Sequence, residues 1–358
     1  MKILKYLFFL ILIIVIGGAI YFGTKDGSYD VSDSKIIDAP IEVVFNKVNE
    51  YKTWENWGPW KNEDPTMRFS YAEKTSGEGA SYSWEGEMSG SMQTTKVIPN
   101  SEIQQELTLN TPAGERNSQV YWLFEEVEGG TKVTWGMKGD HPMIDKIYYE
   151  FGDMDFNATM HDMNIKGLEG IAEAVQNDMK EYTVNVDGVN QYGGGFYMYN
   201  TTASKQTYVL KKMESMFAQV KGYMEQNKIP ASGNPFILYN AMDDLNNTVI
   251  FSAAVPVRDR VITPEGSPII SGLLEAGTAV KTTLKGNYTN LSEAYSAAKK
   301  YINENNFQQD PNARTFEVYV TNPEETPNPA EWITEIYIPI ILQTEAVEDS
   351  LVEPNNLL

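Results

Sequence analysis

The sequence predicts an α+β protein in which an N-terminal transmembrane helix precedes two domains built largely from antiparallel strands. Short segments of alternating apolar and polar residues, separated by Gly, Pro and Asn turns, recur along most of the chain, and helical stripes interrupt them at a few places. The length of 358 residues suits two or three domains. We expect an anchor at 1–24, domains at 30–178 and 180–342, and a disordered acidic tail at 343–358.

Composition excludes several classes of function. Asp and Glu number 49 against 28 Lys and Arg, so the net charge is −21, which is unsuited to binding nucleic-acid phosphates. Cysteine is absent and only two histidines occur, His141 and His161. Disulfides and thiolate nucleophiles are therefore excluded, and two histidines leave almost no residues for a zinc site or for Ser-His-Asp catalysis. We expect no cofactor, no metal and no nucleic-acid partner.

The N-terminus reads as a membrane anchor. Seventeen uncharged residues run from Tyr6 to Phe22, between Lys5 and Lys25. At 1.5 Å per residue, such a helix spans about 25 Å, enough for a thin bilayer. An uncleaved anchor is favoured over a signal peptide, because "GGAIYFG" offers no good cleavage site. Lysines before the apolar run predict a single-pass protein of the bacterial inner membrane with its soluble domains outside the cytoplasm.

The first soluble domain is expected to curve a sheet around one long helix. A strand at Ser34–Asp38 leads into a helix whose first turn contains Pro40. This helix is the first of two short helices expected here, and the aromatic residues Tyr51, Trp54, Trp57 and Trp60 crowd the turn that follows it. The closing helix is expected over Asp153–Met179, with apolar residues recurring along one stripe. The strands expected between them are Met67–Glu73, Ala80–Glu85, Ser91–Ile98, Glu102–Leu109, Gln119–Val127 and Thr131–Lys138.

Three strings in this domain resemble the SRPBCC superfamily of START-like, polyketide cyclase/dehydrase and lipid-transport proteins. They are "APIEVVFNKVNEYKTWENWGPW", "VYWLFEEVEGGTKVTWGM" and the closing helix with "GLEGI". The resemblance implies a helix-grip fold with a deep apolar cavity between helix and sheet. Trp84, Trp122 and Trp135 either line that cavity or form ordinary core, and core is the favoured interpretation for each. Members share the cavity and not one chemistry, so no catalytic residue follows.

The second domain contains an internal repeat. Asn234–Val257 parallels Arg314–Ile340, with Phe236 matching Phe316 and Tyr239 matching Tyr319. Each pair of strands follows a helical stripe, and each helix follows a strand. The expected helices are Ser204–Gln226 and Asn290–Asn305, and the expected preceding strands are Tyr182–Asp187, extended toward Gly193–Tyr199, and Thr278–Lys285. The segment is thus a duplicated βαββ unit, and a duplication of this kind favours a ligand where its two halves meet.

This duplicated segment resembles the GyrI-like small-molecule-binding family, which includes the effector-binding domains of bacterial transcription activators. The string "LKGNYTNLSEAY" carries the family's Gly, Tyr, Leu and Ala-Tyr positions, while "FEVYVTNP" and "WITEIYIPI" resemble its closing strands. Lys285 stands where members often carry His. The resemblance implies a binding domain, and the DNA-binding helix-turn-helix that accompanies it in regulators is replaced here by the anchored first domain.

The resemblance points to Glu317 as the first candidate for ligand binding. In the family, an acidic residue on the matching strand lies in an aromatic cavity and can pair with cationic aromatic ligands. Tyr288 and Trp332 are the implied walls, and Glu335 is a candidate second wall or second carboxylate. Tyr319 shares the face of the strand that carries Glu317. Alternation by itself leaves the other interpretation open, in which Glu317 is a solvent-facing carboxylate.

The sequence is compatible with three functions. The favoured one is a membrane-anchored tandem of small-molecule-binding domains that senses, carries or sequesters hydrophobic or amphipathic ligands, some of them cationic. The second is a detoxifying hydrolase centred on Glu317, because burial raises the pKa of a carboxyl group. The third is a protein-interaction module. Binding is favoured over catalysis, because two cavity folds occur on one chain without a catalytic triad or a metal-ligand set.

Overall fold

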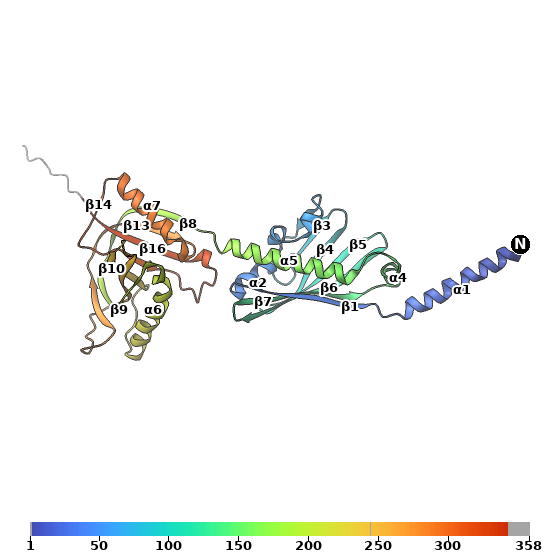
Figure 1. Cartoon of the computed structure of the whole chain (residues 1–358), viewed down its shortest axis with the longest axis horizontal. Helices are drawn as coiled ribbons and strands as arrows, with labels where there is room; N and C mark the ends of the chain where they lie inside the picture. The colour runs from blue at the N-terminus through green and yellow to red at the C-terminus, as the bar shows by residue number, and fades with distance from the viewer. Residues whose placement is uncertain (1, 244, 343–358) are drawn as a thin grey trace, which may run out of the picture. The chain divides into compact units, whose positions relative to one another are not determined.

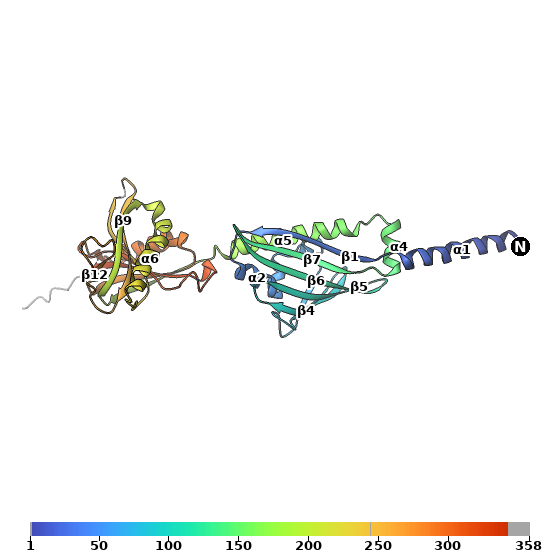
Figure 2. The same cartoon turned by 90° about the horizontal axis from the view of Figure 1, so that it is seen from below.

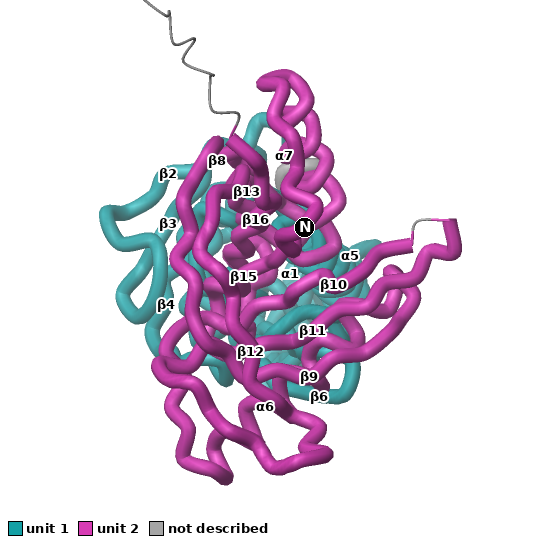
Figure 3. Tube along the Cα trace, turned by 90° about the vertical axis from the view of Figure 1, so that its left-hand side faces the viewer, with its two compact units in different colours: residues 1–178 teal, residues 179–358 magenta. Residues whose placement is uncertain are grey.

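The computed structural model of the protein describes residues 2–243 and 245–342, so the predicted acidic tail lies outside the described residues. The chain divides into two compact units, Met1–Asp178 and Met179–Leu358, which Figure 3 shows in different colours. Each unit combines helices with one antiparallel sheet. The predicted α+β class, with an apolar N-terminal helix before two sheet domains, is confirmed.

Helix α1 (Lys2–Thr24) is the apolar N-terminal segment. Within the described residues it is the one helix long and apolar enough to cross a membrane, over Ile3–Thr24, and none of its most apolar stretch is buried. Only its last turn is covered, where the Phe22 side chain is 6% exposed. Only Lys25, Asp26 and Gly27 separate the end of this helix from the first strand.

A seven-stranded antiparallel sheet forms the first unit, with the strand order β1-β7-β6-β5-β4-β3-β2. Figure 2 shows these strands side by side, with helix α5 (Phe156–Asp178) running along one face. The strands are β1 (Ser28–Ile37), β2 (Arg68–Tyr71), β3 (Ser81–Glu85), β4 (Ser89–Ile98), β5 (Glu102–Thr111), β6 (Gly114–Val127) and β7 (Gly130–Asp140).

Aromatic rings fill the interface between this sheet and the helices that cover it. Short helices α2 (Ile41–Asn49), η1 (Tyr51–Asn56) and α3 (Trp60–Glu63) contribute rings on one side. From the sheet, Trp122 and Trp135 stack with their centroids 4.6 Å apart. Both are at most 3% exposed, whereas Trp84 is half-buried. Trp122 and Trp135 are therefore core residues.

The first unit differs from the prediction in several places, among them the start of β6, which lies at Gly114 and not at Gln119. Strand β1 begins at Ser28, six residues before the expected start, because it pairs with β7 along its whole length. Pro40 is the N-cap of α2 and does not lie within its first turn. Helix α4 (Met143–Phe151) was not expected at all. Its apolar residues Ile144, Tyr148 and Phe151 recur at helical spacing, so the pattern was present in the sequence and was overlooked; the structure turns that side outward.

A nine-stranded sheet forms the second unit, with the order β12-β9-β11-β10-β15-β16-β13-β8 and the short β14 beside β16. Helices α6 (Val209–Gln226) and α7 (Leu291–Glu304) pack on one face of it (Figure 1). The strands are β8 (Thr183–Tyr192), β9 (Gly195–Lys205), β10 (Phe236–Asp243), β11 (Thr248–Val257), β12 (Ile270–Leu274), β13 (Gly277–Lys285), β14 (Gln308–Gln309), β15 (Phe316–Tyr319) and β16 (Ile333–Ile341).

The strand order is symmetric about its centre, as the internal repeat requires. Strands β9, β11 and β10 of one half correspond to β13, β16 and β15 of the other. Both helices also end alike. Lys228 and Asn306 take a left-handed backbone with φ near +55°, and the next N–H bonds back into the last turn, from Ile229 to Met224 and from Phe307 to Ile302.

The edge strands are exchanged between the halves, which the sequence did not predict. The expected continuous strand from Tyr182 is divided at Gly193 and Gly194 into β8 and β9, which lie in opposite halves of the sheet. Strand β12 likewise leads into β13 but pairs with β9. A Cβ on Gly194 would lie 2.3 Å from the Leu274 carbonyl oxygen, so the two connections touch where the sheet curls upon itself.

Candidate functional site

Glu317 lies at the centre of the duplicated unit. Strands β10 and β15 pair antiparallel, and Ile237 is directly opposite Glu317. These two residues also occupy equivalent places in the two repeats. When equivalent residues of equivalent antiparallel strands face each other, the pseudo-twofold axis passes between them. Position 317 therefore stands at the junction of the halves, on the face that α6 and α7 cover.

Three tyrosine hydroxyls hold the Glu317 carboxyl group. Tyr239 and Tyr295 each donate to Oε1 at 2.7 Å, and Tyr319 donates to Oε2 at 2.6 Å. Tyr239 and Tyr319 are equivalent residues of the two repeats, whereas Tyr295 comes from α7. The Glu317 side chain is 1% exposed, so water does not solvate the group. Phenolic hydroxyls take the place of that water.

Burial dominates the electrostatics of this site. It raises the pKa of Glu317, and the three tyrosine hydrogen bonds oppose that rise without cancelling it. Burial first, and the charge on Glu317 second, raise the pKa of Tyr239, Tyr295 and Tyr319 well above the usual value. The phenols therefore stay protonated and act as donors. Among the residues that the structure describes, no lysine or arginine contributes to the pKa of Glu317.

A column of aromatic rings extends from this carboxyl group toward the surface. Tyr319 meets Tyr288 edge-on at 5.1 Å, and Tyr288 lies 4.5 Å from Trp332. The Trp332 indole is half-buried, and its Nε1–H donates to the Thr326 carbonyl at 2.7 Å. Tyr288, Trp332, Tyr319 and Glu317 are thus brought together as one continuous cluster. Of these four side chains only Trp332 is partly exposed, and the Glu317 donors Tyr239 and Tyr295 are partly exposed as well.

Glu335 lies on the other face of the sheet. It is directly opposite Val318 in β15, so its side chain is on the side away from Glu317 and the helices. There it pairs with Lys281 at 2.8 Å and accepts a hydrogen bond from Tyr337 at 2.8 Å. It lines a separate depression of about 390 Å³ with Phe316 and other aromatic residues. Glu335 is therefore no second carboxylate for the Glu317 cluster.

Sequence reasoning missed two residues of this cluster, Tyr239 and Tyr295. The alignment of the repeats already equated Tyr239 with Tyr319, and strand pairing across a twofold axis brings such equivalents together. Tyr295 is the last residue of the string "LKGNYTNLSEAY", which resembles the GyrI-like family. The matched C-caps of the two helices place Phe217 of α6 at the position of Tyr295. Only one helix therefore supplies a hydroxyl.

In the first unit Asp64 is a buried carboxylate, 8% exposed, but its donors are the Thr66 N–H and hydroxyl group and the Glu87 N–H, with no tyrosine among them. His161 contacts Asp33 at 2.8 Å on the surface, and His141 stacks on Tyr29. Within the described residues no group of three or more His, Asp or Glu side chains is arranged to hold a metal ion. A shallow depression of about 630 Å³ is lined by polar residues of β1, β5, β6 and β7, including Ser118 and Lys138.

Two protein-family models match the chain. The GyrI-like small molecule binding domain matches residues 197–341, which include Glu317 and its three tyrosines. The family described as activator of Hsp90 ATPase homolog 1-like protein matches residues 38–146. No curated protein matches the sequence.

Several solved structures match part of this chain at low identity and low TM-score. The crystal structure of the EcmrR C-terminal domain is 19% identical, covers 45% of this chain and 98% of its own, and gives a TM-score of 0.39. A Chromobacterium violaceum protein is 12% identical, with coverage of 41% and 96% and a TM-score of 0.33. A Mesorhizobium loti protein is 16% identical, with coverage of 42% and 98% and a TM-score of 0.31.

The two family matches agree with the two resemblances read from the sequence and with the split of the chain into two units. The chain therefore joins an SRPBCC-like domain of the AHSA1 type to a GyrI-like small molecule binding domain, behind an apolar N-terminal helix.

Proposed function

We propose that the protein is a membrane-anchored small-molecule receptor whose second domain binds an apolar, aromatic cation at Glu317. The observation that carries the proposal is a carboxyl group that is 1% exposed, held by three phenols and compensated by no basic residue among those described. The protein would sense, carry or sequester its ligand, because a buried carboxyl group next to aromatic rings suits the binding of a cation. We assign the binding domain to residues 180–342 and the SRPBCC-like domain to residues 30–178.

The chemistry of the cluster selects the ligand class. A buried carboxylate without a cation is costly, and three hydrogen bonds compensate only part of the lost hydration. A ligand cation placed beside Glu317 would supply the missing charge. The electron-rich faces of Tyr288 and Trp332 attract cations and stack on planar rings. Glu317, Tyr319, Tyr288 and Trp332 are accordingly the proposed contacts.

Access to this site requires a local movement. Glu317 is closed off, and Tyr288 is only 8% exposed. Tyr288 belongs to the short turn η3 (Tyr288–Asn290), and Trp332 follows the short turn η4 (Pro329–Glu331). The Gly286 N–H, which donates to the Trp332 carbonyl at 2.8 Å, links the two segments. We infer that ligand entry displaces this pair of rings, because short turns open at lower cost than packed strands.

The anchor is proposed as an uncleaved, single-pass helix of the bacterial inner membrane with both domains outside the cytoplasm. Two observations support retention of the helix. Its apolar stretch is exposed, as a lipid-facing helix requires. Its last turn packs on the first domain, where the Phe22 and Phe151 rings lie 5.9 Å apart. The ligand would then be one that reaches the outer face of this membrane.

A matched pair of dyes tests the proposed site. N-methylacridinium and acridine have nearly the same size and shape, but only the first is charged at about pH 8. We expect the full-length protein in detergent to bind the cation at least about tenfold more tightly, measured by fluorescence titration. Glu317→Gln should abolish that preference, whereas Glu335→Gln, on the opposite face, should preserve it. Equal affinity of the unsubstituted protein for both dyes would refute the proposal.

The raised pKa of Glu317 favours one other candidate, a hydrolase that uses the protonated carboxyl group as a general acid. This function predicts turnover of a reactive ester or epoxide that disappears in Glu317→Gln. Binding of the dye cation without turnover of such substrates would reject it.

A further inference from the structure

Helix α4 is amphipathic, but its apolar side faces away from its own domain. Its apolar side chains point outward, and none of its residues is buried. Ile144 is 50% exposed, Tyr148 57% and Phe151 78%. These three residues are spaced by four and three positions, so they form one stripe along the helix. A helix that turns such a stripe away from its own domain needs another apolar environment to cover it.

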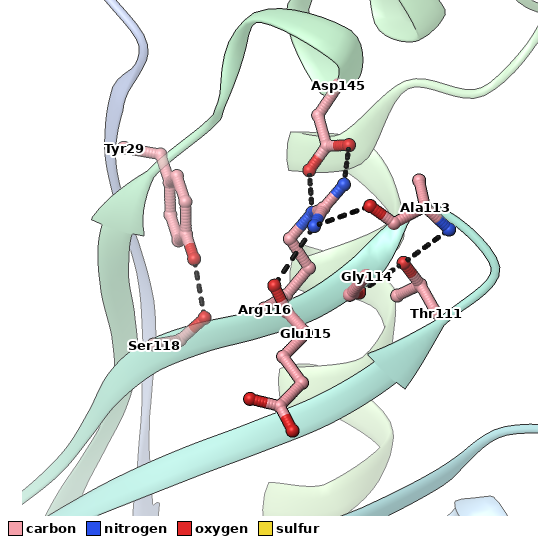
Figure 4. Close-up of polar contacts among 8 residues, drawn as sticks. All are labelled: Tyr29, Thr111, Ala113, Gly114, Glu115, Arg116, Ser118 and Asp145. Carbon is pink, nitrogen blue, oxygen red and sulfur yellow. Dashed lines mark hydrogen bonds and ion pairs between the residues drawn. The ribbon is translucent and has the colours of Figure 1, made fainter.

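Polar contacts, in place of apolar burial, hold this helix on the domain. The Arg116 guanidinium group of β6 donates to both oxygens of Asp145, at 2.5 and 2.7 Å (Figure 4). Tyr149, on the same inward side, packs against His141. Arg116 and Asp145 are 18% and 17% exposed. The helix is therefore fixed with its stripe outward, because its charged side is the one engaged by the protein.

The stripe lies beside the end of the apolar N-terminal helix. Phe151 contacts Phe22, Lys146 donates to the Lys25 carbonyl at 2.7 Å, and Lys25 pairs with Glu150. Only Lys25–Gly27 separate α1 from β1, and three residues reach about 10 Å at most. The short linker and these contacts keep the end of α4 close to the point where α1 would leave a bilayer.

The charges near the stripe decide which kind of bilayer surface it suits. Lys25 is paired with Glu150, and the exposed residues that follow the helix include Asp153 and Asp155. Among the described residues at this end, Lys25 is engaged by Glu150 and Lys146 by the Lys25 carbonyl, so they form no free positive patch for anionic headgroups. Tyr148, by contrast, has the amphipathic ring that is enriched where hydrocarbon meets headgroups. Apolar burial at the interface, and not charge attraction, is the interaction that the stripe offers.

We propose that α4 lies in the headgroup–hydrocarbon boundary of the membrane that holds α1, with Ile144, Tyr148 and Phe151 inserted. This proposal rests on the proposed anchor and adds a second, independent membrane contact. The contact fixes the orientation of the first domain on the membrane, because one helix and one neighbouring stripe together remove its freedom to tilt about the short connection.

Single thiol labels test the insertion, since the natural chain has no cysteine. Full-length protein in phosphatidylcholine nanodiscs, one copy each, would carry the fluorophore NBD at Tyr148→Cys, Ile11→Cys or Ile36→Cys. Ile36, 56% exposed on β1, is the matched control for Tyr148, because eight residues of strand separate it from Ser28. We expect lipids with a doxyl quencher near the headgroup to quench the label at position 148 at least about threefold more than at position 36.

The three label positions distinguish the possible negative results of this experiment. Quenching at position 11 with none at position 148 beyond the control overturns the inserted helix and leaves the anchor intact. No quenching at position 11 rejects the anchor and the insertion together. A label at position 148 that is shielded from water but insensitive to doxyl lipid shows that protein covers the stripe, and this also overturns the proposal. Adding Ile144→Glu and Phe151→Glu should lower quenching at position 148 to the control value.

Discussion

Removing the Tyr319 hydroxyl group is the sharpest test of how Glu317 is held. Tyr319 donates the only hydrogen bond to Glu317 Oε2 among the described residues, whereas Tyr239 and Tyr295 share Oε1. A hydrogen bond to a charged group contributes about 1.5–3 kcal/mol. Tyr319→Phe should therefore destabilise the second domain by about 2–3 kcal/mol at about pH 8. Tyr239→Phe should cost less, about 1–2 kcal/mol, because Oε1 keeps one donor.

The cost should depend on pH, with a sign set by the raised pKa of Glu317. Stability from the neutral carboxyl group is fully present below the unfolded pKa of about 4.3 and is lost as pH rises through the folded pKa. Losing a donor raises the folded pKa further, so the deficit of the variant grows above that pKa. Well below the ordinary glutamate pKa of about 4.3, where the carboxyl group is neutral in both proteins, the deficit should fall below about 1 kcal/mol.

Differential scanning calorimetry of the full-length protein in detergent provides the measurement. The transition of the second domain is the one that shifts in Glu317→Gln. Since about 1 kcal/mol moves the melting temperature of a domain of this size by about 2–4 °C, Tyr319→Phe should lower it by about 4–12 °C at about pH 8. Tyr288→Phe is the control, because this hydroxyl does not contact Glu317. The reasoning is refuted if the two variants melt together at alkaline pH, or if the deficit does not change with pH.

Three further predictions address the first domain. Trp122→Ala should lower the free energy of unfolding of this domain by about 3–5 kcal/mol in chemical unfolding, because this ring is fully buried. Trp84→Ala should lower it clearly less, because Trp84 is half-buried. Gly130→Ala should lower the melting temperature by several degrees, because φ is +124° and the added Cβ would lie 2.1 Å from the Ile37 carbonyl oxygen; an unchanged transition would contradict this geometry. Asp145→Asn should speed amide exchange in residues 143–151 and leave the sheet protected, measured by mass spectrometry.

Local sequence patterns predicted most of the elements and the first candidate residue. The alternating segments between Met67 and Lys138 became strands β2 to β7, because each carries its own turn residues and its own buried face. The repeat was equally visible, since Phe236 and Tyr239 recur as Phe316 and Tyr319. Glu317, by contrast, was a candidate only through family resemblance. Its alternation pattern is equally compatible with a solvent-facing residue.

Other features depended on contacts between distant segments. The apolar residues of α4 recur at helical spacing and were overlooked, but the direction in which they face depends on the contact of Asp145 with Arg116, which lies 29 residues away in the sequence. The division of β8 from β9 at two glycines follows from pairing with opposite halves of the sheet. Glu335 was grouped with Glu317, but the register of β15 against β16 places it on the other face. Strand register between remote segments is not encoded in local periodicity.

The sequence by itself determined that this chain has an apolar N-terminal helix, a sheet domain with one long helix, and a duplicated βαββ domain that carries an isolated acidic residue on a strand. Only the tertiary structure decided what surrounds that residue. Pairing across the pseudo-twofold axis brought Tyr239 and Tyr319 onto the same carboxyl group, and α7 added Tyr295. The physical reason is that burial of Glu317 is a property of both faces packed around it, and those faces come from segments up to 78 residues apart in the chain.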